Sequence, residues 1–143
     1  MPFRSRTAYG LVALLELAAR HAGGDVLQVG EIARRQGIPA RYQEQPPTSL
    51  RRAGLLSSRR GPRGGYRLAR PPAQITVAEV VECLEGVPVA ERRSEPGTPE
   101  FAVVAGLEAA LERRRRELLG GRTLEQLLQE SVVLGASPVM YFI

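Results

Sequence analysis

Apolar residues recur at helical spacing near the start of the chain. The positions that share one helical face are Tyr9, Val12, Leu15 and Ala19. Further apolar residues between them widen this face, so the pattern predicts a largely buried helix over about residues 7–22. A glycine pair followed by aspartate then ends the helix.

Two short helices are predicted next. The first covers about residues 29–36, because its apolar side chains fall on one face and Gly37 supplies a C-cap. The second ends near Ala53, just before Gly54. Two helices joined by a tight turn that contains glycine are typical of a helix-turn-helix.

The next segment has the pattern of a β-hairpin. Residues 55–59 and 66–69 flank the loop 60–65, in which glycines permit tight turns and a proline stiffens the backbone. The loop carries Arg60 and Arg63. Helices followed by a basic hairpin indicate a winged helix-turn-helix, in which one helix enters the major groove and the wing touches the backbone or the minor groove.

The second half of the chain is predicted to be helical with one interruption. Thr76 and Glu79 have the spacing of a capping box, which opens a fourth helix that stops at Gly86. Residues 87–100 are polar and contain prolines, so they are expected to be a linker. A longer helix follows over about residues 101–119.

This longer helix carries a heptad-like row of apolar residues, interrupted by Arg114. The row consists of Val104, Leu107, Leu111 and Leu118. A helix that follows a linker usually needs a partner, so these residues are predicted to form a homodimer interface. The alternative is that they belong to the core of their own subunit.

The C-terminal part is expected to add a short helix and a tail. Thr123 and Gln126 form a second capping box, for a helix over 124–130, and the apolar segment 132–143 is expected to pack on its own subunit or a partner. The predicted fold is therefore mainly α with a small β-hairpin wing. A winged helix-turn-helix domain (1–86) and a linker (87–100) precede a dimerisation region (101–143).

Composition restricts the classes of function. The chain has 143 residues, of which 43% are hydrophobic and 24% charged, as expected for one folded domain. Its single cysteine, Cys83, and single histidine, His21, cannot form an intrachain disulfide or a Cys/His zinc site within one subunit. We therefore expect no cofactor, and we expect Cys83 to be a buried, inert thiol.

The charge is distributed unevenly. All 20 basic residues are arginines, and residues 1–70 carry a net charge of +9 while residues 71–143 carry −4. This asymmetry predicts that the first half faces a polyanion, with nucleic acid as the leading partner and an anionic membrane as the rival. No apolar stretch is long enough to span a bilayer and no signal peptide is recognised, so the cytoplasm is the expected compartment.

Several arginines are candidate DNA contacts. Those at the hairpin, Arg59, Arg60 and Arg63, are better explained by nucleic-acid binding than by simple solvation, because they surround a glycine-bounded tip. Five further arginines either bind phosphates or merely face solvent: Arg34, Arg35, Arg41, Arg51 and Arg52.

Together these segments resemble one family, the Rrf-type winged-helix transcriptional regulators, which is the IscR and CymR family. The matching positions are Tyr9, 31–33, Tyr42, 50–55, 60–68 and 82–86. The resemblance implies a dimeric bacterial transcription factor in which the helix over 101–119 forms the dimer interface. It also implies that Tyr42, Gln43, Glu44 and Arg60 contact DNA.

The sequence departs from that family at two places. Iron–sulfur members carry three cysteines in the loop after the fourth helix, whereas residues 87–97 contain none, so a cluster is not expected. Pro46 and Pro47 fall inside the segment that the family uses as its recognition helix. Each proline costs about 3 kcal/mol in a helix interior, so we predict that this helix begins at Pro46 and that residues 42–45 form a turn or irregular chain.

The leading hypothesis is a homodimeric regulator that binds a palindromic site in duplex DNA. The alternative is a winged-helix module that lost specific DNA binding through Pro46 and Pro47 and now binds proteins. A weaker reading is a variant that binds a flavin or metabolite, and a small-molecule or protein effector stays open. No catalytic constellation or phosphate-binding loop is recognised, so the chain is not expected to be an enzyme.

Overall fold

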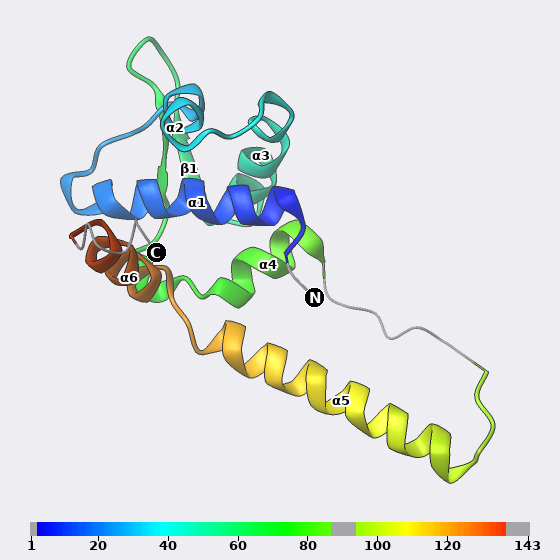
Figure 1. Cartoon of the computed structure of the whole chain (residues 1–143). Helices are drawn as coiled ribbons and strands as arrows, with labels where there is room; N and C mark the ends of the chain where they lie inside the picture. The colour runs from blue at the N-terminus through cyan, green and yellow to red at the C-terminus, as the bar shows by residue number, and fades with distance from the viewer. Residues whose placement is uncertain (1–2, 87–93, 137–143) are drawn as a thin grey trace.

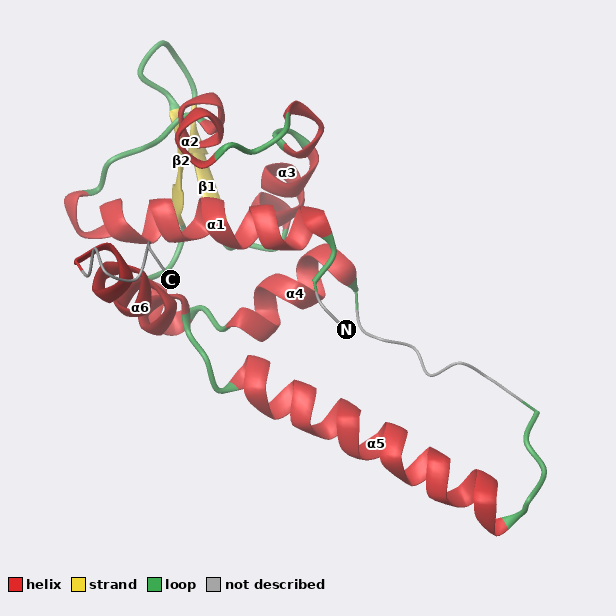
Figure 2. Cartoon of the chain, viewed as in Figure 1, coloured by secondary structure: helices red, strands yellow, loops and turns green. Residues whose placement is uncertain are grey.

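Helices dominate the computed structural model, which describes residues 3–86 and 94–136 (Figures 1 and 2). The elements are α1 (Ser5–Arg20), α2 (Val29–Gln36), α3 (Gln45–Arg52), β1 (Leu56–Arg59), β2 (Gly65–Leu68), α4 (Val77–Glu85), α5 (Pro99–Gly120) and α6 (Leu124–Ala136). The predicted class, mainly α with a small β-hairpin, is confirmed.

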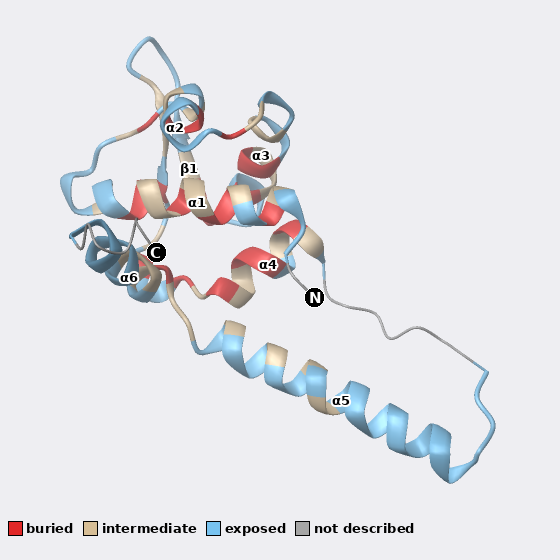
Figure 3. Cartoon of the chain, in the orientation of Figure 1, coloured by how far each residue is buried: buried red, intermediate tan, exposed pale blue. Residues whose placement is uncertain are grey.

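The core surrounds α1, which packs against α2, α3, α4 and α6. Side chains from different elements meet there, and Leu14, Ile75, Val80 and Leu124 are completely buried. Figure 3 shows buried positions gathered on α1, α3 and α4. The apolar face predicted for the first helix is therefore the surface on which the other elements assemble.

α1 and α4 approach each other closely at a glycine. A Cβ placed on Gly10 would lie 2.7 Å from Cδ1 of Leu84, so the packing has no space for a larger side chain. The start of α4 is fixed by the predicted capping box. The Glu79 N–H donates to Oγ1 of Thr76 over 3.2 Å, and the Thr76 N–H donates to the Glu79 carboxylate over 3.3 Å.

α6 returns to the core after α5. The Leu124 N–H donates to the Ile75 carbonyl over 3.0 Å and the Val77 N–H donates to the Arg122 carbonyl over 2.9 Å. The predicted capping box is present, because the Gln126 N–H donates to Oγ1 of Thr123. These contacts attach the start of α6 beside the start of α4.

The predicted boundary between the last helix and an apolar tail is wrong. Residues 132–136 belong to α6, because the helix continues past residue 130 beside α1 to Ala136. Leu127 and Leu128 pack on the core along this path. The remainder of the predicted tail, 137–143, lies outside the described residues.

α5 stands apart from the other helices and contacts α4 (Figures 1 and 3). α5 includes the whole of the helix predicted over residues 101–119. It begins after Thr98, whose Oγ1 accepts the Phe101 N–H over 3.5 Å, and it ends before Gly121. Of the predicted linker, residues 94–98 are irregular and Pro99 and Glu100 belong to α5, while 87–93 lie outside the described residues.

Candidate nucleic-acid interface

The wing is an antiparallel hairpin whose turn depends on glycine. Arg59 pairs with Gly65 at the end of the two strands, and the Gly64 N–H closes the loop on the Gly61 carbonyl over 2.9 Å. Gly61 has a φ of 106°, a conformation that favours glycine. A Cβ on Gly64 would lie 2.1 Å from the Arg59 carbonyl oxygen, so the tip can close only without a side chain there.

The base of the wing is attached to the segment before α2. Leu27 exchanges two backbone hydrogen bonds with Tyr66, of 2.9 and 2.8 Å. Gly65 permits this pairing, because a Cβ there would lie 2.4 Å from the Leu27 carbonyl oxygen. The sequence analysis missed this contact, because a single paired residue leaves no alternating pattern to recognise.

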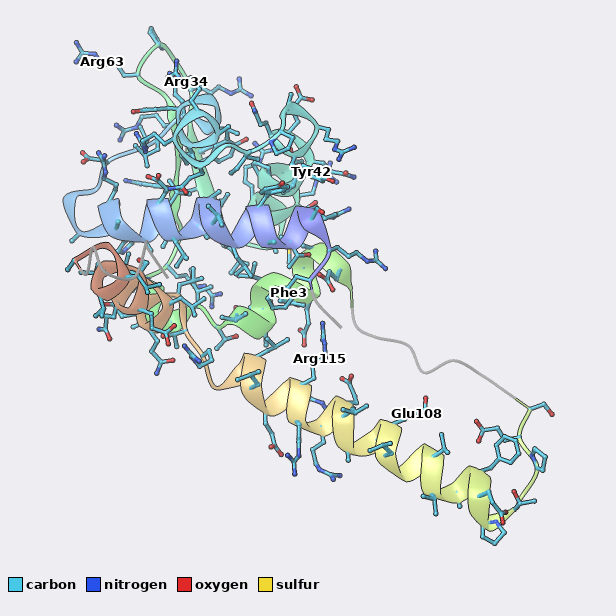
Figure 4. All side chains as sticks on the ribbon, in the orientation of Figure 1. Phe3, Arg34, Tyr42, Arg63, Glu108 and Arg115 are labelled. Carbon is cyan, nitrogen blue, oxygen red and sulfur yellow. The ribbon has the colours of Figure 1, made fainter. Side chains whose placement is uncertain are left out.

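The wing presents its arginines to solvent. Arg59, Arg60 and Arg63 are exposed, and Figure 4 shows Arg63 at the outer end of the wing with Arg34 of α2 below it. Arg67, by contrast, donates its Nε to Oγ of Ser57 on the facing strand over 3.3 Å. The tip arginines are therefore accessible to a polyanion.

α3 accommodates both prolines in its first turn. The helix begins at Gln45, one residue before the predicted start. Both prolines therefore lie in the first turn, where a missing N–H costs little. Pro46 and Pro47 are buried together with Leu50, so their rings attach the helix to the core. The opposite side of α3, which includes Gln45 and Arg51, is exposed.

The segment before α3 is held by two aromatic rings. A 3-10 turn covers Ala40–Tyr42, and the Tyr42 ring lies 4.9 Å from the Tyr9 ring of α1. The Arg41 guanidinium lies 5.0 Å from the centre of the Tyr42 ring. Tyr42 is half-buried. Its contacts within the chain therefore help to position this turn.

Gln43 and Glu44 differ in how far they are available to a ligand. The Gln43 amide nitrogen donates to the Ile38 carbonyl over 3.2 Å, and its side chain is half-buried. Glu44 is exposed, and its carbonyl accepts the hydroxyl of Thr48 over 2.9 Å. Of these two predicted DNA contacts, Glu44 is the more accessible.

Neighbouring arginines on α2 have different surroundings. Arg35 donates to the Glu16 carboxylate of α1 over 3.2 and 2.7 Å and to Glu31 over 2.9 Å, and Gln36 donates to Glu16 over 2.7 Å. The hydrogen bonds from Arg35 hold the pKa of Glu16 below its ordinary value. Arg35 thus joins α1 to α2, whereas Arg34 is exposed.

The predicted dimer residues lie on the surface of α5. The exposed fractions are 51% for Val104, 63% for Leu107, 63% for Leu111 and 60% for Leu118. The described part of the chain therefore leaves this apolar row uncovered.

Cys83 lies between α4 and α3. Its Sγ donates to the Ser49 carbonyl over 3.4 Å, and burial raises the pKa of the thiol. The residue is half-buried, which is less than predicted. Within residues 3–86 and 94–136 there is no group of three His, Cys, Asp or Glu side chains that could hold a metal ion.

None of the helices described is both long enough and apolar enough to cross a bilayer.

Comparison with known proteins decides the family. Residues 3–130 match the Rrf2 family, which is described as "Iron-dependent Transcriptional regulator". The chain belongs to the Rrf2 family. An Rrf2 regulator with an exposed wing and a helix-turn-helix is a DNA-binding protein, which agrees with the charge asymmetry of the sequence.

Relatives of this Rrf2 regulator occur in several bacteria. It is 35% identical to the HTH-type transcriptional regulator IscR of Xenorhabdus nematophila over 137 residues, which cover 94% of this chain and 83% of the relative. It is 43% identical to IscR of Cereibacter sphaeroides over 86 residues, which cover 59% of this chain and only 56% of that relative. These proteins are transcriptional regulators and not enzymes.

Solved structures confirm the fold. The chain is similar to CymR, the global cysteine regulator of B. subtilis, with a TM-score of 0.79 and 31% identity, covering 91% of this chain and 98% of CymR. It is similar to T. potens IscR with a TM-score of 0.69 and 31% identity, covering 92% and 88% of the two chains.

The residues of this Rrf2 regulator do not fit an iron–sulfur cluster held within one subunit. Iron–sulfur clusters are held by several cysteine thiolates, and the sequence contains only Cys83. The thiol of Cys83 is hydrogen-bonded between two helices, and burial raises its pKa, which disfavours the thiolate that binds metals.

Proposed function

We propose that this Rrf2 regulator binds a palindromic operator in duplex DNA as a homodimer, without an iron–sulfur cluster. The observation that carries the proposal is the position of the wing. Its exposed arginines project on the same side of the molecule as α2 and α3, while α5 extends from the opposite side (Figures 1 and 4). DNA bound on the side of the wing and a second subunit bound at α5 then do not compete for the same surface.

DNA contacts are assigned to the wing, to α2 and to α3 with the segment that precedes it. Arg60 and Arg63 at the tip suit the minor groove or the phosphates, and the exposed side of α3 suits the major groove. The full proposed set is Arg34, Arg41, Tyr42, Gln43, Glu44, Arg51, Arg59, Arg60 and Arg63. Arginines on helix surfaces position the protein through phosphates, whereas base contacts give sequence preference.

Dimerisation is assigned to α5. Its exposed apolar row follows the spacing of a helix-pair seam, and covering it would remove apolar surface from water. A dimer with two-fold symmetry places two recognition elements on one face, so a palindromic site with half-sites about 34 Å apart is expected.

The rival function is a module that binds proteins and has lost specific DNA recognition. It draws its support from Pro46 and Pro47 in α3. Because both rings face the core and the exposed side of the helix retains Gln45 and Arg51, we favour DNA recognition. A DNA-binding regulator of this kind would act in the cytoplasm.

DNA binding is tested by titrating the protein with promoter fragments from its own genomic neighbourhood. Several phosphate contacts predict that affinity falls by orders of magnitude between about 50 and 200 mM salt. Arg60→Ala should weaken binding and reduce the salt dependence, whereas the matched control Arg116→Ala, on α5, should do neither. A wild-type protein that binds no fragment better than random DNA would favour the protein-binding alternative.

Dimerisation is tested separately by sedimentation. The double substitution Leu107→Glu and Leu111→Glu places charges in the apolar row and should give a monomer with unchanged helix content. Glu100→Gln, at the exposed start of α5, is the control. A double variant that stays dimeric would exclude α5 as the interface.

A further inference from the structure

Three helices meet at one carboxylate, that of Glu85 at the end of α4. The backbone N–H of Arg4, just before α1, donates to Oε2 of Glu85 over 3.0 Å. Oε1 of the same side chain lies 3.7 Å from the guanidinium of Arg115 on α5. Figure 4 shows Arg115 on the side of α5 that faces α4. Glu85 thus contacts both the DNA-binding part and the helix proposed for dimerisation.

This pair is more enclosed than an ordinary surface ion pair. The side chains are only 14% exposed for Glu85 and 30% for Arg115. Burial works to raise the pKa of Glu85, but hydrogen bonds, including that from Arg4, and the nearby arginine charges outweigh it and lower the pKa. The carboxylate is therefore charged at neutral pH, and its charge also suits the positive end of α1.

Within one subunit, α5 is held along α4 and near its own end. Within Pro99–Gly120 no residue is buried by the described part of the chain; the contacts of α5 are chiefly with α4, and Leu119 near its end packs partly buried against the core. A long helix held along a short stretch is free to pivot, and a change of angle at the contact is magnified at the far end. An ion pair at this contact, with 3.7 Å between the Arg115 guanidinium and the Glu85 carboxylate, opposes the pivot through charge attraction.

We propose that Glu85 is a positioning residue for operator binding. Through Arg115 it fixes the angle between α5 and the DNA-binding part, and so the separation of the two α3 helices in the dimer. This inference depends on the proposed function. Both halves of a dimer engage a palindrome together only when their separation matches the half-sites, because the second contact gains from a high effective concentration only in that geometry.

The angle itself is tested without DNA. Nitroxide labels are placed at Ala19→Cys on α1 and Val103→Cys on α5 in a Cys83→Ala background, and labelled chains are diluted with unlabelled ones. The parent should give a narrow distribution of distances. Glu85→Gln, which keeps an acceptor for the Arg4 N–H, and Arg115→Gln should both broaden or shift it. Arg116→Gln, the exposed neighbour, should not.

The consequence for DNA is tested with an operator that the wild-type protein selects from a random duplex pool. Both variants should bind the full palindrome about tenfold more weakly and discriminate less between half-site spacings. Their affinity for a single half-site, their dimer fraction and their unfolding temperature should stay close to those of the wild type. A purely structural role of Glu85 would instead weaken half-site and full-site binding equally.

The outcomes separate the two proposals. Unchanged distance distributions in both variants, or an unchanged spacing preference, would overturn the role of Glu85 while leaving operator binding intact. A wild-type protein that selects no operator would overturn the proposed function, and the distance measurement would still decide whether Glu85 fixes the angle of α5.

Discussion

The ring of Tyr42 lies against the ring of Tyr9, with centres 4.9 Å apart and planes tilted by 41°. Tyr9 belongs to α1, the helix at the centre of the core, whereas Tyr42 ends the turn that leads into α3. The aromatic contact therefore connects the core directly to the segment that carries Arg41 and Glu44. Residues proposed to touch DNA are positioned by a residue that does not.

Removing this aromatic contact should weaken both stability and DNA binding. A tilted aromatic pair contributes about 1 kcal/mol beyond its buried area, so Tyr9→Leu should lower the free energy of unfolding in urea by at least that amount. It should also lower affinity for operator DNA, because the turn before α3 loses its support. Tyr9→Phe keeps the ring and should restore both quantities; a Phe variant as weak as the Leu variant would show that the hydroxyl matters instead.

A single methyl group at the wing tip should disturb DNA binding selectively. In Gly64→Ala the new Cβ would meet the Arg59 carbonyl oxygen at 2.1 Å, so the loop must open and move Arg60 and Arg63. We expect weaker DNA binding with a smaller salt dependence and an unchanged core, measured by fluorescence titration and thermal unfolding. Gly106→Ala on α5, where nothing lies within 4 Å, is the matched control and should bind DNA normally.

The contact between α1 and α2 should make stability depend on pH. The pKa of Glu16 in the folded state lies below its ordinary value of 4.5, chiefly because of the hydrogen bonds from Arg35. The stabilisation is therefore fully present above pH 4.5 and is lost as the pH falls through the lower, folded-state pKa. Glu16→Gln should be less stable than the wild type at neutral pH, and the difference should shrink on acidification.

Chemical denaturation between about pH 3 and pH 7 measures this difference. Arg35→Gln should show the same weakened dependence of stability on pH as Glu16→Gln. The double variant should lose little more stability than either single variant, because both changes remove the same interaction. Parallel stability curves for the wild type and Glu16→Gln would show that the carboxylate contributes nothing specific.

Truncating Leu124 should destabilise the whole domain. This side chain is completely buried where α6 returns to the core, so Leu124→Ala should lower the free energy of unfolding by about 2–5 kcal/mol. Val133→Ala on the same helix, at a residue 68% exposed, should change it by less than about 0.5 kcal/mol. Equal effects at the two positions would mean that α6 does not form part of the cooperative core.

Leu124 also bears on the proposed division of the chain at residue 86. The start of α6 pairs with the backbone before α4, so the core of the DNA-binding part includes a residue that follows α5. A chain that ends at residue 86 should expose Ile75 and Val80 and unfold more easily. The sequence could not reveal this return, because an apolar helical face does not indicate which distant surface covers it.

The sequence predicted the wing and the helix caps well, because their signals are local. A glycine-rich turn between two short apolar runs, or threonine three positions before glutamate or glutamine, contains almost all the interactions that stabilise it. The start of α3 was predicted within one residue because proline restricts its own backbone regardless of the surroundings. The roles of Pro46 and Pro47 in the core were missed, since burial depends on neighbours that arrive from elsewhere.

By itself, then, the sequence determined which segments become helices, where the hairpin turns and which half of the chain carries positive charge. Only the tertiary structure decided which charged groups stay free. Arg35 is engaged by Glu16 and Arg115 by Glu85, while Arg34 beside the first of these pairs is exposed. The reason is physical: local backbone preferences act over a few residues, whereas an ion pair between two helices forms only where packing brings side chains that are distant in the sequence within a few ångströms.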